Sequence, residues 1–107
     1  TCGTGQHHTT KLVMESLEGV VKPGDSVLDL GCGSGILSIA ALLFGAEKVT
    51  MCDIFENAVK TASENVEKNH FTHEHYTAYC GNIIDDAELR GRIGTGYDVS
   101  VRTSSRT

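Results

Sequence analysis

Residues 25–35 read Asp-Ser-Val-Leu-Asp-Leu-Gly-Cys-Gly-Ser-Gly, and this stretch decides the fold of the 107-residue chain. The segment from Ser26 to Leu30 is rich in apolar and β-branched residues, which predicts a buried strand. An apolar segment of helical length follows over residues 36–44. Between the two stand three glycines at alternate positions, Gly31, Gly33 and Gly35. A strand, a tight glycine turn and a helix form the first half of a nucleotide-binding βαβ unit, so we expect an α/β fold.

The spacing of the glycines indicates which class of nucleotide-like ligand the turn would bind. The dinucleotide fingerprint is G-x-G-x-x-G, but here Ile36 occupies the place of the third glycine. With Asp29 the turn reads D-x-G-x-G-x-G, which resembles the first motif of class I S-adenosylmethionine-dependent methyltransferases. Gly31 and Gly33 would line that ligand, because a missing Cβ lets it approach the backbone. Asp29 would meet the ligand's ammonium directly or through a water. The alternative is a tight βα connection that binds nothing.

A second acidic residue supports a nucleoside-like ligand. The segment 47–54 predicts a strand, and Asp53 lies near its end, twenty-two residues after Gly31. One helix and one strand fill that spacing, so the carboxylate is expected at the carboxyl edge of the neighbouring parallel strand. There it can accept both hydroxyls of a ribose. The alternative is an ordinary N-cap for the next helix.

Composition and charge narrow the class of protein. The length fits one small domain. The net charge of −5 and the lack of a basic stripe argue against direct nucleic-acid binding. No apolar run is long enough for a membrane span. The four cysteines are widely spaced, which is typical of reduced thiols in a cytoplasmic protein.

The resemblance becomes specific upstream of the glycine turn. Residues 3–10 read Gly-Thr-Gly-Gln-His-His-Thr-Thr and precede a predicted helix. Its buried face is expected to hold Leu12, Val13, Leu17, Val20 and Val21. This G-T-G-x-H-x-T-T element, together with residues 27–42, resembles the catalytic domain of the PrmA family, bacterial methyltransferases of large-subunit ribosomal protein eleven.

The resemblance extends over residues 2–101 and implies a cofactor, a partner and further site residues. The cofactor is S-adenosylmethionine, and Thr10, the second threonine of the pair, contacts it. The substrates are lysine and N-terminal amines of a ribosomal protein. His7 matches a family histidine, which could equally be a loop residue that packs the helix start.

Two stretches after Asp53 bear on ligand binding. A helix is predicted over residues 55–69, where Phe55 would pack either on an adenine or in the core. A third strand is predicted over Tyr76–Cys80, and Asn82 follows where many class I methyltransferases have an aspartate. The Asn82 carbonyl oxygen could accept the adenine amine. The histidines that lie between, His70, His73 and His75, indicate a solvated loop rather than a metal site.

The end of the chain departs from the family. A fourth strand is expected over residues 97–101, and the family asparagine near the transferred methyl is replaced by Thr103. We therefore expect a partial S-adenosylmethionine-binding methyltransferase domain over residues 1–101 and a polar tail over 102–107. The fold would be the N-terminal half of the Rossmann-like class I methyltransferase fold, an incomplete sheet with parallel strands in the order 3-2-1-4 and flanking helices. The exposed sheet edge invites an oligomer.

Three functions are weighed. The first is an S-adenosylmethionine-dependent protein methyltransferase, for which no covalent nucleophile is needed and no catalytic side chain is assigned. The second is a non-catalytic fragment that binds S-adenosylmethionine, which Thr103 and Asn82 favour. The third is a nicotinamide-dependent oxidoreductase, against which Ile36 argues.

Overall fold

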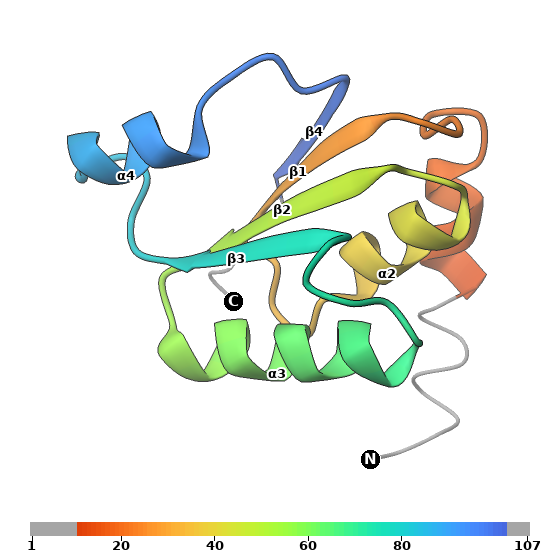
Figure 1. The fold of residues 1–107 in the computed structure, drawn as a ribbon, viewed down its shortest axis with the longest axis horizontal. Coiled ribbons are helices and arrows are strands. Elements are labelled where there is room, and N and C mark those ends of the chain that lie inside the picture. The colour runs from red at the N-terminus through yellow and green to blue at the C-terminus, as the bar shows by residue number, and fades with distance from the viewer. Residues whose placement is uncertain (1–10, 103–107) are drawn as a thin grey trace.

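A computed structural model describes residues 11–102 of the chain. Residues 11–17 are helical and precede the sheet. The elements that follow are β1 (Ser26–Leu30), α2 (Ile36–Leu43), β2 (Lys48–Asp53), α3 (Glu56–Lys68), β3 (Tyr76–Cys80), α4 (Ala87–Ile93) and β4 (Val99–Arg102) (Figure 1). The predicted β1 and β3 have the bounds that the sequence indicated. β4 begins later than predicted and reaches Arg102.

The four strands form one parallel sheet in the order β3-β2-β1-β4 (Figure 1), which confirms the predicted order. In this register Leu30 lies beside Cys52 and Arg102, and Asp53 lies beside Cys80. The carboxyl ends of all four strands therefore meet at one edge of the sheet. Residues that follow the strands in sequence are brought together there.

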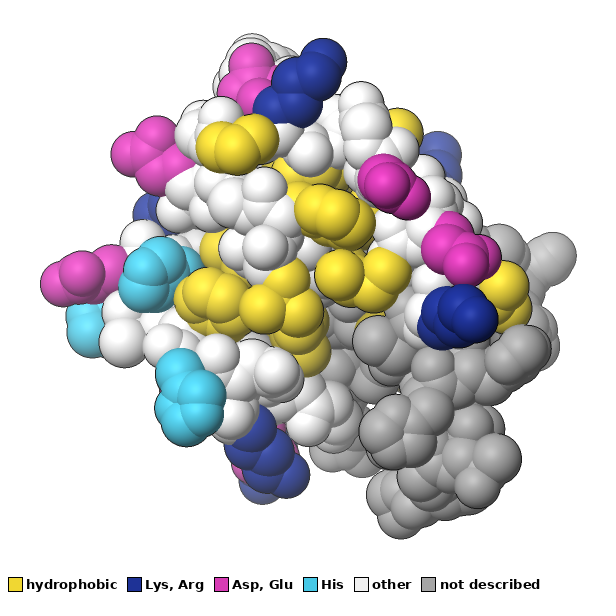
Figure 2. All heavy atoms as spheres, turned by 90° about the vertical axis from the view of Figure 1, so that its right-hand side faces the viewer, with side chains coloured by type: hydrophobic (Ala, Val, Ile, Leu, Met, Phe, Trp, Pro, Cys, Tyr) yellow, Lys and Arg dark blue, Asp and Glu magenta, His cyan; other side chains and the backbone are white. Residues whose placement is uncertain are grey.

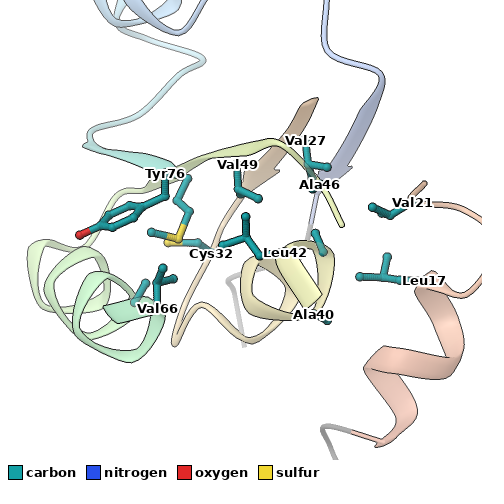
Figure 3. Packing of buried hydrophobic residues seen from close by; sticks show 13 residues of the cluster. Leu17, Val21, Val27, Cys32, Ala40, Leu42, Ala46, Val49, Val66 and Tyr76 are labelled. Carbon is teal, nitrogen blue, oxygen red and sulfur yellow. The ribbon is translucent and has the colours of Figure 1, made fainter. Parts of the chain in front are cut away.

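The main core lies between the sheet and the helices α2 and α3, which cover the same face (Figures 1 and 3). Val49 and Met51 of β2 are 0 % exposed and meet Ala62 and Val66 of α3, which are also 0 % exposed. Burying each large apolar side chain stabilises the fold by about 1.5–3 kcal/mol.

A smaller cluster lies on the other face of the sheet. Leu28 and Cys52 of the sheet pack against Leu89 and Ile93 of α4. Helix α4 begins with a side-chain cap, since the Asp86 carboxylate accepts the Leu89 N–H at 3.0 Å. The sheet therefore carries helices on both faces, as parallel sheets require.

The first helix packs with a narrower apolar face than predicted. Leu17 and Val21 are buried and join the main core, and Val13 packs against it. Leu12 and Val20 are 52 % and 49 % exposed, so their predicted burial is wrong. The helix ends at Leu17, which places Val20 in a turn outside the helical periodicity.

Apolar side chains also reach the surface of the face that looks to the right in Figure 1. Figure 2 shows them gathered in the centre of that face, with histidines at the left and charged side chains around the rim on all sides. This face lies opposite the carboxyl edge of the sheet, where the predicted site residues gather.

Candidate functional site

The glycine turn joins β1 to α2 in a left-handed backbone conformation. The φ angles are 78° at Gly31, 55° at Gly33 and 86° at Gly35. The N–H groups of Gly31 and Cys32 donate to the Cys52 carbonyl oxygen at 2.8 and 3.1 Å, which ties the turn to the end of β2. A Cβ built at Gly33 would meet nothing within 4 Å. The turn therefore presents bare backbone to open space at Gly33.

Gly35 is required for a different reason. It is the N-cap of α2, and a Cβ there would lie 3.0 Å from both Cα and Cβ of Ala62. The turn thus lies directly against α3, and only glycine combines that approach with a left-handed φ. Asn65 of α3 strengthens the contact, since its side-chain amide donates to the Ser34 carbonyl oxygen at 2.9 Å.

Asp53 connects the glycine turn to the start of α3. Its Oδ2 accepts the Gly33 N–H at 2.9 Å, and its Oδ1 accepts the Phe55 N–H at 3.0 Å. The side chain is buried, with 4 % of its surface exposed. The N-cap residue of α3 is Phe55, without a side-chain cap, so the alternative role of Asp53 as that cap is not observed. Each carboxylate oxygen retains acceptor capacity for a further hydroxyl.

A hollow of about 220 Å³ opens at this carboxyl edge. It receives residues from the ends of all four strands: Leu30, Gly31, Cys52, Asp53, Ile54, Asn82, Ile83, Ile84 and Arg102. The apolar residues at its rim are accessible, with Ile54 50 % and Ile84 67 % exposed. An acidic wall beside apolar walls suits a ligand with a sugar and a flat ring.

The apolar walls were not predicted from the sequence. Ile54 comes directly after the acid, and Ile83 and Ile84 come directly after Gly81-Asn82. The sequence signal that could have identified these walls is their position, because they follow two predicted polar site residues, Asp53 and Asn82, at the ends of strands.

Asn82 shapes the loop that carries two of these walls. Its Oδ1 accepts the Ile84 N–H at 2.9 Å, and its Nδ2 donates to the Asp85 carboxylate at 3.2 Å. This local turn presents Ile83 and Ile84 to the hollow. Phe55 is 58 % exposed, so it is not part of the core, and it does not line the hollow.

Asp29 lies beneath the turn rather than in the lining of the hollow. It is 0 % exposed, and its Oδ2 accepts the Ser38 hydroxyl at 2.6 Å. Its Oδ1 is buried and has no hydrogen-bond partner among residues 11–102. Burial raises the pKa of Asp29, the hydrogen bond from Ser38 opposes that rise, and the charge of Asp53 adds to it. A buried acceptor without a donor is costly, so the site is suited to an incoming N–H or ammonium group.

Three thiols surround the same region, and none forms a disulfide. Cys32 and Cys52 are buried and Cys80 is exposed. Burial raises the pKa of Cys32 to about 12, and nearby carboxylates add to the rise. Burial also raises the pKa of Cys52. Both thiols are thus protonated at neutral pH, and neither is suited to act as a nucleophile.

The structure brings Gly31, Asp53 and Asn82 together at the hollow, and Gly33 joins them through its hydrogen bond to Asp53. Thr10 lies outside the described residues, as do His7 and Thr103.

Other features of the described part of the chain, residues 11–102, give no second site of this kind. Within residues 11–102, no group of three or more histidine, cysteine or acidic side chains could hold a metal ion. No helix in that part of the chain is long and apolar enough to cross a membrane. A larger hollow of about 360 Å³ lies elsewhere against the sheet, near Thr50, Arg92 and Tyr97, and its described lining includes none of the predicted site residues.

Comparisons with known proteins agree with this geometry. The family described as "Ribosomal protein L11 methyltransferase (PrmA)" matches residues 1–91. A ribosomal protein L11 methyltransferase of Lachnospira eligens is 45 % identical over 98 residues, which cover 91 % of this chain and 31 % of that protein. One of Staphylococcus epidermidis is 53 % identical over 91 residues, covering 85 % and 29 %. The chain therefore spans about a third of the length of these relatives.

Solved structures of methyltransferases share the fold. The magnesium protoporphyrin IX methyltransferase of Synechocystis, solved with bound SAH, has a TM-score of 0.68 and 27 % identity, covering 92 % of this chain and 42 % of that one. The PRMT1 enzyme-prozyme complex of Trypanosoma brucei, with AdoHcy, has a TM-score of 0.71 and 26 % identity, covering 90 % and 29 %.

Proposed function

The chain belongs to the ribosomal protein L11 methyltransferase (PrmA) family, and from that premise we propose that its hollow binds S-adenosylmethionine for methyl transfer to a ribosomal protein. The observation that carries the proposal is the convergence of the glycine turn, Asp53 and the isoleucine walls at one edge of the sheet. Related methyltransferase structures with bound SAH or AdoHcy support this choice of ligand.

The residues present fit the nucleoside part of this cofactor. The Asp53 carboxylate would accept the ribose hydroxyls, with Gly31 and Gly33 beside it. Ile54, Ile83 and Ile84 would enclose the adenine, and the Asn82 carbonyl oxygen would accept its amine. A hollow of about 220 Å³ is below the usual range for a whole drug-sized ligand, so we assign it to the adenosine half.

The ammonium of the cofactor's amino-acid half is assigned to Asp29, which does not line the hollow. The unpartnered Oδ1 of Asp29 is buried, so it would take the ammonium through a water. Thr10, which lies outside the described residues, is assigned to the cofactor on the family resemblance alone.

The chemistry follows from binding and orientation. When bound, the cofactor supplies a methyl group on a sulfonium that is already a good leaving group. The chain holds the donor in line with an incoming neutral amine, and such alignment alone accounts for a large rate enhancement. No protein nucleophile is required, in agreement with the protonated thiols at the site. The substrate amines, on lysine side chains and an N-terminus, are those that the family implies.

The remaining partners follow from the same premise. We propose a cytoplasmic protein that does not bind nucleic acid directly, in keeping with the net charge of −5. β4 lies at an edge of the described sheet, and self-association through that edge stays a prediction that analytical ultracentrifugation tests.

A second candidate function is binding of the cofactor without catalysis. Two observations favour it: Asn82 stands in place of an aspartate, and Thr103 stands in place of the family asparagine. An amine-methylation assay with the ribosomal protein separates the two functions once binding is established.

Calorimetric titration of the chain with S-adenosylmethionine tests the proposal. We expect saturable binding that weakens by at least about tenfold in Asp53→Ala, because the ribose loses a charged acceptor worth about 1.5–3 kcal/mol. Glu64→Gln is the matched control, because it also removes one negative charge but lies on the exposed side of α3. This variant should bind S-adenosylmethionine normally. Circular dichroism establishes that each variant is folded. A folded wild-type chain that binds nothing would contradict the proposal.

A further inference from the structure

Arg102 places a positive charge at the cofactor hollow. It is the last residue of β4, lies beside Leu30 in the sheet and lines the hollow together with Gly31 and Asp53. Within residues 11–102 the one side-chain ion pair joins Glu88 and Arg92, so no carboxylate of that segment forms an ion pair with Arg102. The side chain is exposed to solvent.

The charge matters because the cofactor before and after methyl transfer differs in charge at one atom. S-adenosylmethionine carries a cationic sulfonium, whereas the demethylated product, S-adenosylhomocysteine, has a neutral thioether. Adenine, ribose, ammonium and carboxylate are the same in both. A cation in the lining therefore repels the donor's sulfur and leaves the product's sulfur unaffected, while its attraction for the carboxylate cancels in the comparison.

The size of the hollow sets the scale of the repulsion. The sulfur is bonded to the ribose, which the hollow would hold, so it lies at the border of the hollow. A sphere with the volume of the hollow, about 220 Å³, is about 7–8 Å across, which puts the sulfur within roughly that distance of the lining. Two like charges at about 7–8 Å, with an effective dielectric constant near 40 for a half-open site, repel enough to change an affinity about five- to tenfold.

On the premise of the proposed function, we propose that Arg102 is a specificity-determining residue that weakens donor binding relative to product binding. Its charge raises the ratio of the donor dissociation constant to the product dissociation constant by about five- to tenfold, which favours S-adenosylhomocysteine. Asp53 opposes this effect, but its contribution is the same in the wild type and in variants of Arg102.

The test is a pair of calorimetric titrations, one with each ligand, on four forms of the chain at low ionic strength. Arg102→Met removes the charge and keeps an unbranched side chain, whereas Arg102→Lys keeps the charge. Arg92→Met, which removes the exposed arginine paired with Glu88 on α4, is the matched control. Thermal melts establish that the variants are folded.

We expect the ratio of donor to product dissociation constants to fall about five- to tenfold in Arg102→Met. The ratio should stay near the wild-type value in Arg102→Lys and in Arg92→Met. Raised salt should bring the ratios of the wild type and Arg102→Met closer together, because added ions screen the charge that distinguishes the two forms.

Two results overturn the inference in distinguishable ways. Equal ratios in the wild type and Arg102→Met, with both ligands bound, refute the role of Arg102 and leave the proposed function intact. Absence of binding of either ligand to the folded wild type refutes both.

Discussion

Replacing Gly35 by alanine should destabilise the chain more than the same change at Gly33, two residues away. Both glycines belong to the same turn and both have a positive φ, 86° and 55°. They differ in their surroundings. A Cβ at Gly35 would lie 3.0 Å from the Cα and Cβ of Ala62, whereas a Cβ at Gly33 has nothing within 4 Å.

The two costs can be estimated separately. A left-handed backbone costs an L-residue about 1–2 kcal/mol, and this applies to both variants. Overpacking against the backbone of α3 costs Gly35→Ala about 1–3 kcal/mol more. We therefore expect a loss of about 2–5 kcal/mol for Gly35→Ala and about 1–2 kcal/mol for Gly33→Ala. The free energy of unfolding of a native domain is only about 5–15 kcal/mol, so Gly35→Ala removes much of the stability.

Urea denaturation followed by circular dichroism measures both losses. A difference of 1 kcal/mol corresponds to a shift of roughly 4–8 °C in Tm for a chain of this size, so thermal melts give a second reading. A double-mutant cycle with Ala62→Gly isolates the contact: the coupling energy should offset part of the Gly35→Ala loss, although glycine in α3 costs about 1 kcal/mol itself. If Gly35→Ala costs no more than Gly33→Ala, the close approach of the turn to α3 is refuted.

Three further predictions follow from buried side chains. Burial raises the pKa of Asp29 above its ordinary 3.8, so the folded state binds that proton more tightly than the unfolded state and stability is lost as the pH rises from about 4 through the raised pKa. Urea titrations from pH 4 to 8 should show the wild type losing stability relative to Asp29→Asn, and a constant difference would contradict this. In a Cys2→Ser background, Ellman's reagent at pH 8 should modify the exposed Cys80 rapidly and the buried Cys32, with a pKa of about 12, only on unfolding. The rapid phase should vanish in Cys80→Ser. Met51→Ala should cost about 2–5 kcal/mol in urea denaturation, because Met51 is 0 % exposed, whereas Met51→Leu should cost less than about 1.5 kcal/mol.

Local sequence signals predicted the backbone of the site well. The β-branched run of β1, the glycines of the turn and the apolar helix after them are neighbours in sequence, and each residue type acts on its own φ, ψ and burial. The order of elements then limits the topology, because parallel strands need crossover connections and the two sheet faces need helices. The sheet order β3-β2-β1-β4 and the place of Asp53 at its carboxyl edge agree with that reasoning.

Helical periodicity was less reliable where the helix is short. It predicted burial of Leu12 and Val20 from their spacing alone. The helical segment ends at Leu17, and Ser16 beside Leu12 donates its hydroxyl to the Leu12 carbonyl oxygen on the solvent side. Spacing describes an ideal helix and carries no information about where the chain leaves it.

The sequence by itself determined that the chain is an α/β domain with a glycine turn and an acid at the end of its second strand. Only the tertiary structure decided that Ile54 and Ile84 form the walls, that Asp29 lies beneath the turn, and that Arg102 reaches the hollow. The physical reason is distance along the chain. Leu30 and Arg102 are 72 residues apart and become neighbours through the register of β1 and β4, a pairing that depends on packing of the whole sheet.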